Sequence, residues 1–275
     1  MIIQVHTPSF PLSDYVNGFI FYDGLEPLHQ MDRFLPDGNT ELIINLTDKP
    51  QFIYHNETLE EMQTCRQAWV GGVRTQPITI PSGKGSQMLI VAFKKGRAHP
   101  FYPLPMNELT DFVVEADLVF GRGILNLREQ LLTALSVDEM FYRVEKFLLG
   151  QARHTLSTDG ASRCVEYAVS RMISRPNRLG FQQLSAEIGY SQKHFISLFH
   201  RQVGVAPKQY LKIMRFQKAI LDIEKDTSIH WNDLALQNGF YDQAHFNNEF
   251  KAFSGFTPGE YVKRKSDLLN YIPVG

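Results

Sequence analysis

The sequence predicts an α+β protein of two domains. We expect an N-terminal small β-barrel with helices after it, and a C-terminal all-α domain with two helix-turn-helix motifs joined by a long helix. Three observations lead to this prediction: strand-like runs separated by turn residues, a later change to helical spacing, and a helical unit that occurs twice. The chain of 275 residues is long enough for two domains with separate cores.

The first domain is expected over residues 1–105. Short apolar or aromatic runs in it have the composition of strands and are bounded by turn residues. These runs span residues 18–23, 40–47, 51–56, 67–73, 77–81 and 87–94. Gly38, Gly83 and Gly85 lie between runs, where glycine supplies the positive φ that tight turns require. Many short strands without helices between them favour a sandwich or a small barrel.

Two amphipathic helices are expected within residues 106–150. One carries an apolar face of Ile124, Leu127, Leu131 and Leu135. The other carries an apolar face of Met140, Val144, Phe147 and Leu148, and Ser136 with Glu139 has the spacing of a capping box at its start. This second face needs a partner, either the strand domain or the same helix of another subunit. Its four residues are therefore our candidates for a homodimer contact.

Residues 151–161 are small and polar without periodicity, which predicts a linker. The net charge of the sequence changes sign at this segment. Residues 1–161 hold 13 Lys and Arg against 19 Asp and Glu, a net of −6, and residues 162–265 hold 15 against 9, a net of +6. This asymmetry indicates a polyanion-binding domain joined to one with another task, although a chance imbalance of surface lysines would look similar. Residues 266–275 are expected to form a C-terminal tail.

The C-terminal domain, residues 162–265, contains the duplicated unit. Phe, Phe, Gly, Pro and Tyr follow His194 at offsets +1, +5, +10, +13 and +16, and they follow His245 at the same offsets. Each unit reads as a helix, a turn with glycine and a second helix, which is the helix-turn-helix plan. Residues 207–225 connect the units as a helix of roughly 28 Å, close to one turn of DNA at about 34 Å.

The second helix of each unit has an outward face opposite its apolar side. The candidate DNA-binding residues are Ser191, Gln192, Lys193, Ile196, Ser197, His200 and Arg201 in the first unit, and Asp242, Gln243, Ala244, Asn247, Asn248 and Lys251 in the second. Gln and Asn can pair with an adenine edge, apolar groups suit a thymine methyl, and basic groups with helix N-termini hold phosphates. The alternative is that these polar residues only solvate an exposed helix face.

Residues 162–265 resemble the DNA-binding domain of the AraC/XylS family of transcriptional regulators. The resemblance is carried by Leu184, Ala186, Gly189, Ser191, Phe195, Phe199, Gly204, Pro207, Tyr210, Leu211, Arg215, Ala219, Ile229, Ala235, Gly239, Phe240, Phe246, Phe250, Lys251, Gly255, Pro258 and Tyr261. It implies a seven-helix domain that binds double-stranded promoter DNA and activates transcription by contacting RNA polymerase, with repression as the other mode. It also implies base contacts by Lys193, Ile196, Ser197, Gln243, Ala244, Asn247 and Asn248. These positions hold no arginine, which the family often uses there.

The front half resembles a sensor domain found ahead of this DNA-binding domain. The segments "RFLPDGNTELIINL", "WVGGV" and "MNELTDFVVEADLVFG" carry this resemblance, which implies a cupin-like barrel that binds a small-molecule effector without naming it. Arg33, Tyr22, Trp69, Tyr54 and Arg74 could line such a pocket or simply belong to the core and surface, so no effector site is assigned. The alternative function is a DNA-binding architectural protein whose front domain is only a dimerisation or partner-binding scaffold.

Other chemistry finds little support in the sequence. His6, His29, His55 and His99 form no metal-binding cluster, and no phosphate-binding loop or nucleophile motif occurs, so we expect no metal, no cofactor and no enzyme activity. Cys65 and Cys164 are too far apart for a zinc-ligand spacing and too few for a DNA-repair methyltransferase. The apolar runs are too short for a membrane span, and residues 1–10 lack a secretory signal, so a cytoplasmic location is expected.

Overall fold

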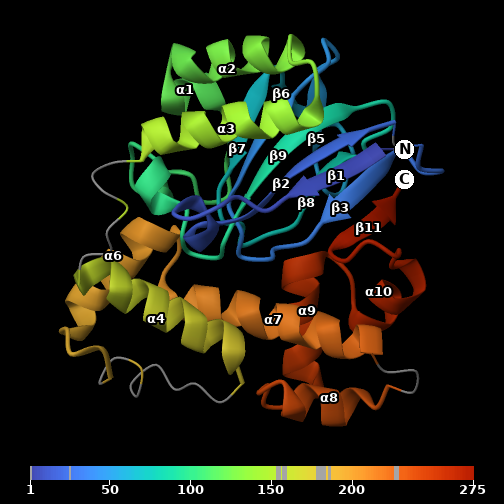
Figure 1. The fold of residues 1–275 in the computed structure, drawn as a ribbon. Helices are drawn as coiled ribbons and strands as arrows, with labels where there is room; N and C mark the ends of the chain where they lie inside the picture. The colour runs from blue at the N-terminus through green and yellow to red at the C-terminus, as the bar shows by residue number, and fades with distance from the viewer. Residues whose placement is uncertain are drawn as a thin grey trace.

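The computed structural model describes residues 2–24, 26–152, 156, 160–177, 184, 187–225 and 229–275. Strands dominate the N-terminal part and helices the C-terminal part, as Figure 1 shows. The predicted α+β fold class is confirmed, but the N-terminal strands of the described residues form two sheets and no closed barrel. Most of the predicted linker, residues 151–161, and most of the first helix expected in the first unit, residues 181–188, lie outside the described residues.

Two antiparallel sheets form the N-terminal domain. The six-stranded sheet has the order β1 (Ile2–His6), β2 (Val16–Asp23), β9 (Gln87–Phe93), β4 (Glu41–Asn45), β7 (Ala68–Gly71) and β10 (Val113–Glu115). The five-stranded sheet has the order β11 (Tyr271–Val274), β3 (Met31–Phe34), β8 (Ile78–Pro81), β5 (Gln51–Tyr54) and β6 (Glu61–Cys65). Within the described residues the strands make two sheets, and side chains from both meet around Cys65, Trp69 and Met88.

All six predicted strands are present, and the turn glycines Gly38, Gly83 and Gly85 have positive φ. The sequence did not predict β1, β3, β6, β10 or β11. Strand β10 has only three residues and β6 carries mostly polar side chains, so neither shows the apolar alternation that marks a half-buried strand.

Helices α1 (Ala116–Phe120), α2 (Arg122–Leu132) and α3 (Val137–Gln151) cover one face of the six-stranded sheet (Figure 1). Ile124, Leu127 and Leu131 are buried as expected, but Leu135 is 96% exposed. That part of the prediction is wrong because α2 ends at Leu132, before the helical face would reach Leu135. Ser136 caps α3, while the Glu139 carboxylate accepts from the Leu135 N–H instead of closing the predicted capping box.

The apolar face of α3 packs within its own chain. Val144 and Leu148 are fully buried in the core that includes Leu42 and Val91 of the sheet, and Met140 and Phe147 pack against the same core. The strand domain is thus the partner of this face, which was the first of the two alternatives. The homodimer itself stays a prediction.

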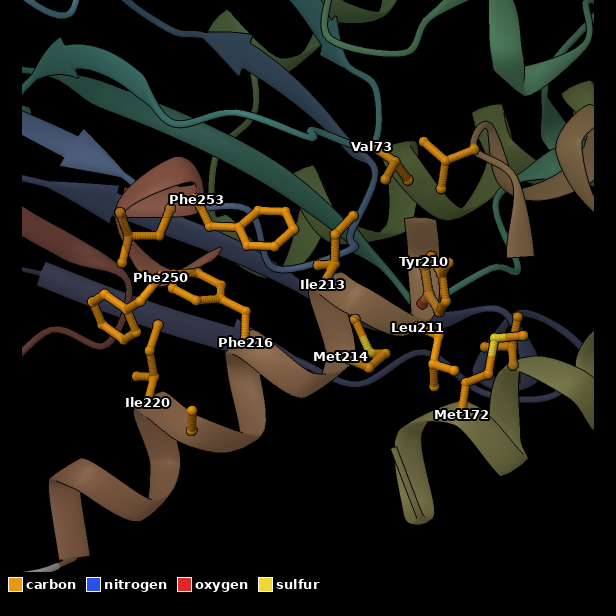
Figure 2. Close-up of a cluster of buried hydrophobic side chains, with 14 of the residues drawn as sticks. Val73, Met172, Tyr210, Leu211, Ile213, Met214, Phe216, Ile220, Phe250 and Phe253 are labelled. Atoms are coloured by element: carbon orange, nitrogen blue, oxygen red, sulfur yellow. The ribbon is translucent and has the colours of Figure 1, made fainter. Parts of the chain in front are cut away.

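The C-terminal part is helical. It contains α4 (Gly160–Ser174), α6 (Gln192–Val203), α7 (Pro207–Lys225), α8 (Trp231–Gln237), α9 (Gln243–Ser254) and α10 (Pro258–Arg264). The long helix α7 packs aromatic side chains against both units, with Tyr210 at 5.7 Å from Phe199 and Phe216 at 5.1 Å from Phe250, measured between ring centroids. Figure 2 shows Phe216 beside Phe250 and Phe253 in this cluster.

The last strand, β11, returns to the N-terminal domain and pairs with β3 at the edge of the five-stranded sheet (Figure 1). Ile272 of β11, Leu35 and Val73 belong to the same buried cluster as the core of the helical domain. The two halves therefore share a continuous apolar interior. Among the helices of the described part, none is long and apolar enough to cross a membrane.

We predict that Phe216→Ala lowers the free energy of unfolding by about 3–5 kcal/mol, because it removes a buried ring that contacts two others. Urea unfolding followed by circular dichroism measures this change. Leu221→Ala is the matched control on the same helix, since Leu221 is 40% exposed, and its cost should be below about 1 kcal/mol. Equal costs for the two variants would contradict the described packing.

Candidate nucleic-acid interface

Helix α6 is fixed at both ends and along its inner face. The Ser191 hydroxyl accepts a hydrogen bond from the His194 N–H at 3.3 Å, and the helix ends at Gly204, whose φ is +105°. Phe195 and Phe199 are fully buried. A capped start and buried aromatic anchors leave the opposite side of the helix in a defined orientation.

Helix α9 repeats this construction. The Asp242 carboxylate accepts from the His245 N–H at 2.7 Å, the helix ends at Gly255 with φ +79°, and Phe246 and Phe250 are buried. The residues that repeat in the sequence therefore anchor and end the second helix in both units.

The turns before the two helices also match. Gly189 and Gly239 both have φ +75°, a conformation that side chains with a Cβ rarely adopt. Each glycine allows the chain to turn sharply into the following helix, so the predicted turn is confirmed in both units.

The predicted contact residues lie on the outward faces of α6 and α9. The exposed ones are Ser191, Gln192, Lys193, Ser197, His200, Arg201, Asp242, Gln243, Ala244, Asn248 and Lys251. Ile196 and Asn247, which occupy equivalent positions, are partly buried. The structure therefore presents two similar polar faces, the first with Lys193 and Arg201 and the second with Lys251 as its cationic side chain.

Known proteins match both halves of the chain. A family model described as a helix-turn-helix domain matches residues 184–264, and a model described as a domain of unknown function (DUF6597) matches residues 4–115. The HTH-type transcriptional activator AarP of Providencia stuartii is 29% identical over 85 residues, which are 31% of this chain and 62% of AarP. The helix-turn-helix match and the likeness to AarP support the resemblance of residues 162–265 to the AraC/XylS family.

Two further similarities complete the comparison. An uncharacterised HTH-type transcriptional regulator of Staphylococcus aureus is 37% identical over 84 residues, 30% of this chain, and the match spans only 11% of that relative. A structure of ToxT from Vibrio cholerae has a TM-score of 0.46 and 11% identity, covering 89% of this chain and 98% of ToxT.

The structure adds two exposed residues that the sequence did not predict as part of this surface. Tyr190 and Tyr241 precede the capping residues of α6 and α9, at the same offset from His194 and His245, and they are 39% and 84% exposed. The Tyr190 ring lies 5.0 Å from the His194 ring, and the Tyr241 N–H donates to His245 Nδ1 at 3.3 Å. Their equal offset within the repeat was the signal that could have identified them.

One acidic side chain of α9 has basic neighbours. Glu249 accepts from Lys212 of α7 at 2.5 Å, and His245 Nε2 lies 3.6 Å from the same carboxylate oxygen. The Lys212 ammonium offsets a negative charge near the outward face, which carries the exposed Lys251.

The interior of the N-terminal domain is packed with side chains. Tyr22 packs against the cluster of Cys65, Trp69 and Met88, and burial raises the pKa of the Cys65 thiol to about 12, which leaves it unreactive at neutral pH. Arg33 is buried and directed towards the ring of Phe256 in the C-terminal domain. Among the described residues, no group of His, Cys, Asp and Glu could hold a metal ion.

Glu41 of β4 has a carboxyl group whose pKa is raised by its surroundings. Desolvation and then the nearby Asp37 raise the pKa of its carboxyl from 4.5 to about 7, and Lys95 and Arg74 oppose that shift. A carboxyl whose pKa is higher in the folded chain than in the unfolded one favours folding in its neutral form.

We predict that the free energy of unfolding falls as the pH rises from the unfolded pKa of 4.5 through about 7, because the folded chain then carries a poorly solvated Glu41 carboxylate. The Glu41→Gln variant keeps a neutral side chain, so the fall should be smaller. Urea unfolding of both proteins between about pH 5 and pH 8 measures the difference. Identical pH profiles would contradict this assignment.

Proposed function

We propose that this chain is a sequence-specific DNA-binding transcriptional regulator that places α6 and α9 in two successive major-groove segments of a promoter. The supporting observation is that two equally capped and anchored helices present exposed polar faces from one connecting helix, α7. Its 19 residues correspond to roughly 28 Å of helix, a length that suits two sites about one turn of DNA apart.

The composition of the two faces supports a division of labour. Gln192, Gln243 and Asn248 are amides suited to base edges, and Ile196 and Ala244 are apolar groups suited to thymine methyls. Lys193, Arg201 and Lys251 together with the N-termini of both helices suit phosphates. Tyr190 and Tyr241 are exposed beside those termini, and we expect their hydroxyls to donate to phosphates.

We assign activation, through contact with RNA polymerase, as the mode of regulation, and this rests on the likeness to a protein described as a transcriptional activator. Binding to a promoter places the protein in the cytoplasm. Effector sensing and formation of a homodimer are the tasks we propose for the N-terminal domain.

The second candidate is a scaffold role for that domain without effector sensing. The side chains of Cys65, Trp69 and Met88 pack between the sheets with Tyr22, Ile43 and Ile53 against them, which favours a filled interior. Such a domain would serve dimerisation or partner binding alone.

We predict that Asn248→Ala weakens binding by about 1–3 kcal/mol and relaxes the base preference at one position, because an exposed amide of α9 is lost. Gel-shift titration measures this with duplexes that the full chain selects from a random-sequence pool. Met62→Ala, on an exposed position of β6, is the control and should bind like the wild type. A base preference unchanged by Asn248→Ala would refute a reading role for this side chain.

We predict that Lys251→Ala weakens binding to all duplexes alike and makes the negative slope of log K against log salt concentration smaller in magnitude by about 1, because one phosphate contact is lost. The same titrations in a series of salt concentrations give the slope. Lys84→Ala is the matched control, since Lys84 is an exposed lysine of the N-terminal domain. If both variants keep the wild-type slope, Lys251 does not contact phosphate.

A further inference from the structure

The N-terminal domain touches the two helix-turn-helix units at equivalent positions. Gly204 and Gly255 end α6 and α9 and stand at the same offset, +10, from His194 and His245. Each glycine is approached by a side chain of the N-terminal domain, Thr110 in the first unit and Arg33 in the second.

The contact at the first unit is a hydrogen bond. Thr110 Oγ1 donates to the Gly204 carbonyl oxygen at 2.6 Å. A methyl group on Gly204 would lie 3.2 Å from Thr110 Oγ1 and 3.3 Å from the Met106 carbonyl oxygen, so the end of α6 lies close against residues 106–110. The N-terminal domain thereby fixes the C-terminal end of the first recognition helix.

The contact at the second unit involves a buried cation. Arg33 of β3 is 8% exposed, and its Cζ lies 4.9 Å from the centroid of the Phe256 ring. A methyl group on Gly255 would lie 2.6 Å from Arg33 Nη1. Arg33 Nη2 donates to the carbonyl oxygen of Asn56, which holds the guanidinium to the N-terminal domain.

Residues of α7 and β11 also contact the segment that carries Arg33. Gln217 of α7 donates to the Pro36 carbonyl oxygen at 2.8 Å and to Asn270 Oδ1 at 2.9 Å. Ile272 of β11 pairs with Arg33 itself in the sheet register. The polypeptide that carries Arg33 is therefore tied to the connecting helix as well as to the second unit.

We infer that the N-terminal domain sets the spacing and relative rotation of α6 and α9 by holding both units at these glycines, with Thr110 and Arg33 as positioning residues for DNA recognition. This inference rests on the proposed function. It goes beyond it because it gives the front domain a direct part in site selection, independent of any effector or dimer.

The physical consequence is a strict half-site spacing. One inserted base pair shifts the second half-site by about 3.4 Å and rotates it by about a tenth of a turn. Units joined by α7 alone could adjust to such a change by small shifts in packing. Units held also at Gly204 and Gly255 are preorganised for one spacing and resist that adjustment.

The experiment uses the full chain and a duplex that it selects from a random-sequence pool, with versions that carry one inserted base pair between the two half-sites. Wild-type affinity should fall at least about 10-fold on insertion, comparable to the loss of a specific base contact. Thr110→Val lacks the hydroxyl, so its affinity should fall only about 3-fold or less when the base pair is inserted. Thr110→Ser keeps the hydroxyl and should restore the wild-type penalty.

Arg33→Met tests the contact at Gly255 in the same way. It removes the guanidinium and keeps an apolar side chain against Phe256. Arg264→Met is its matched control, since Arg264 Cζ lies 5.2 Å from the same ring but belongs to the C-terminal domain. A smaller insertion penalty for Arg33→Met than for Arg264→Met supports the inference. Thermal unfolding verifies that each variant is folded before its affinity is measured.

The outcomes separate the inference from the function on which it rests. If the wild type selects a duplex and Thr110→Val and Arg33→Met keep its full insertion penalty, the inference is wrong and the proposed function stands. If the wild type selects no sequence, the proposed function is wrong and the inference fails with it.

Discussion

The aromatic packing of α7 against both helix-turn-helix units is the interaction on which the rest of the structure depends. Tyr210 contacts Phe199 of α6 near the start of α7, and Phe216, six residues later, contacts Phe250 and Phe253 of α9. Because buried aromatic rings are held by dense packing, they orient the recognition helices as well as stabilising the domain. A polar face that reads bases is useful only when its helix cannot rotate about its own axis.

The N-terminal domain packs directly against this core. Its Leu35 and Val73 belong to the same buried cluster as Phe199 and Phe250, and an ion pair joins Arg97 to Glu166 of α4 at 3.2 Å. Strand β11 closes the connection from the other end of the chain. Strand β3 contacts the second unit through Arg33. A conformational change in β3 would therefore act directly on the position of that unit.

The sequence predicted those features that depend on local pattern. Equal offsets from His194 and His245 identified the duplicated unit, and in the structure Ser191 and Asp242 cap the second helix of each unit. These features were accessible because helix periodicity and capping involve residues within a few positions of one another.

Two features that the sequence did not predict, strand β11 and the burial of Arg33, are non-local. Strand β11 has four residues, one of which is a proline. Its partner β3 lies more than two hundred positions earlier in the chain, so no local pattern marks the pairing. Arg33 could equally have been a surface or a pocket residue, because its burial depends on where the C-terminal domain packs. The outward faces of α6 and α9 were located correctly, whereas the individual base contacts stay predictions because they depend on the DNA.

Hydroxyl-radical footprinting of the full chain on a duplex that it has selected tests the central claim most directly. We predict two protected patches on the same face of the duplex, about 10 base pairs apart, one for each recognition helix. A single protected patch, or patches on opposite faces, would contradict the account in which both units of one chain read successive segments of the major groove.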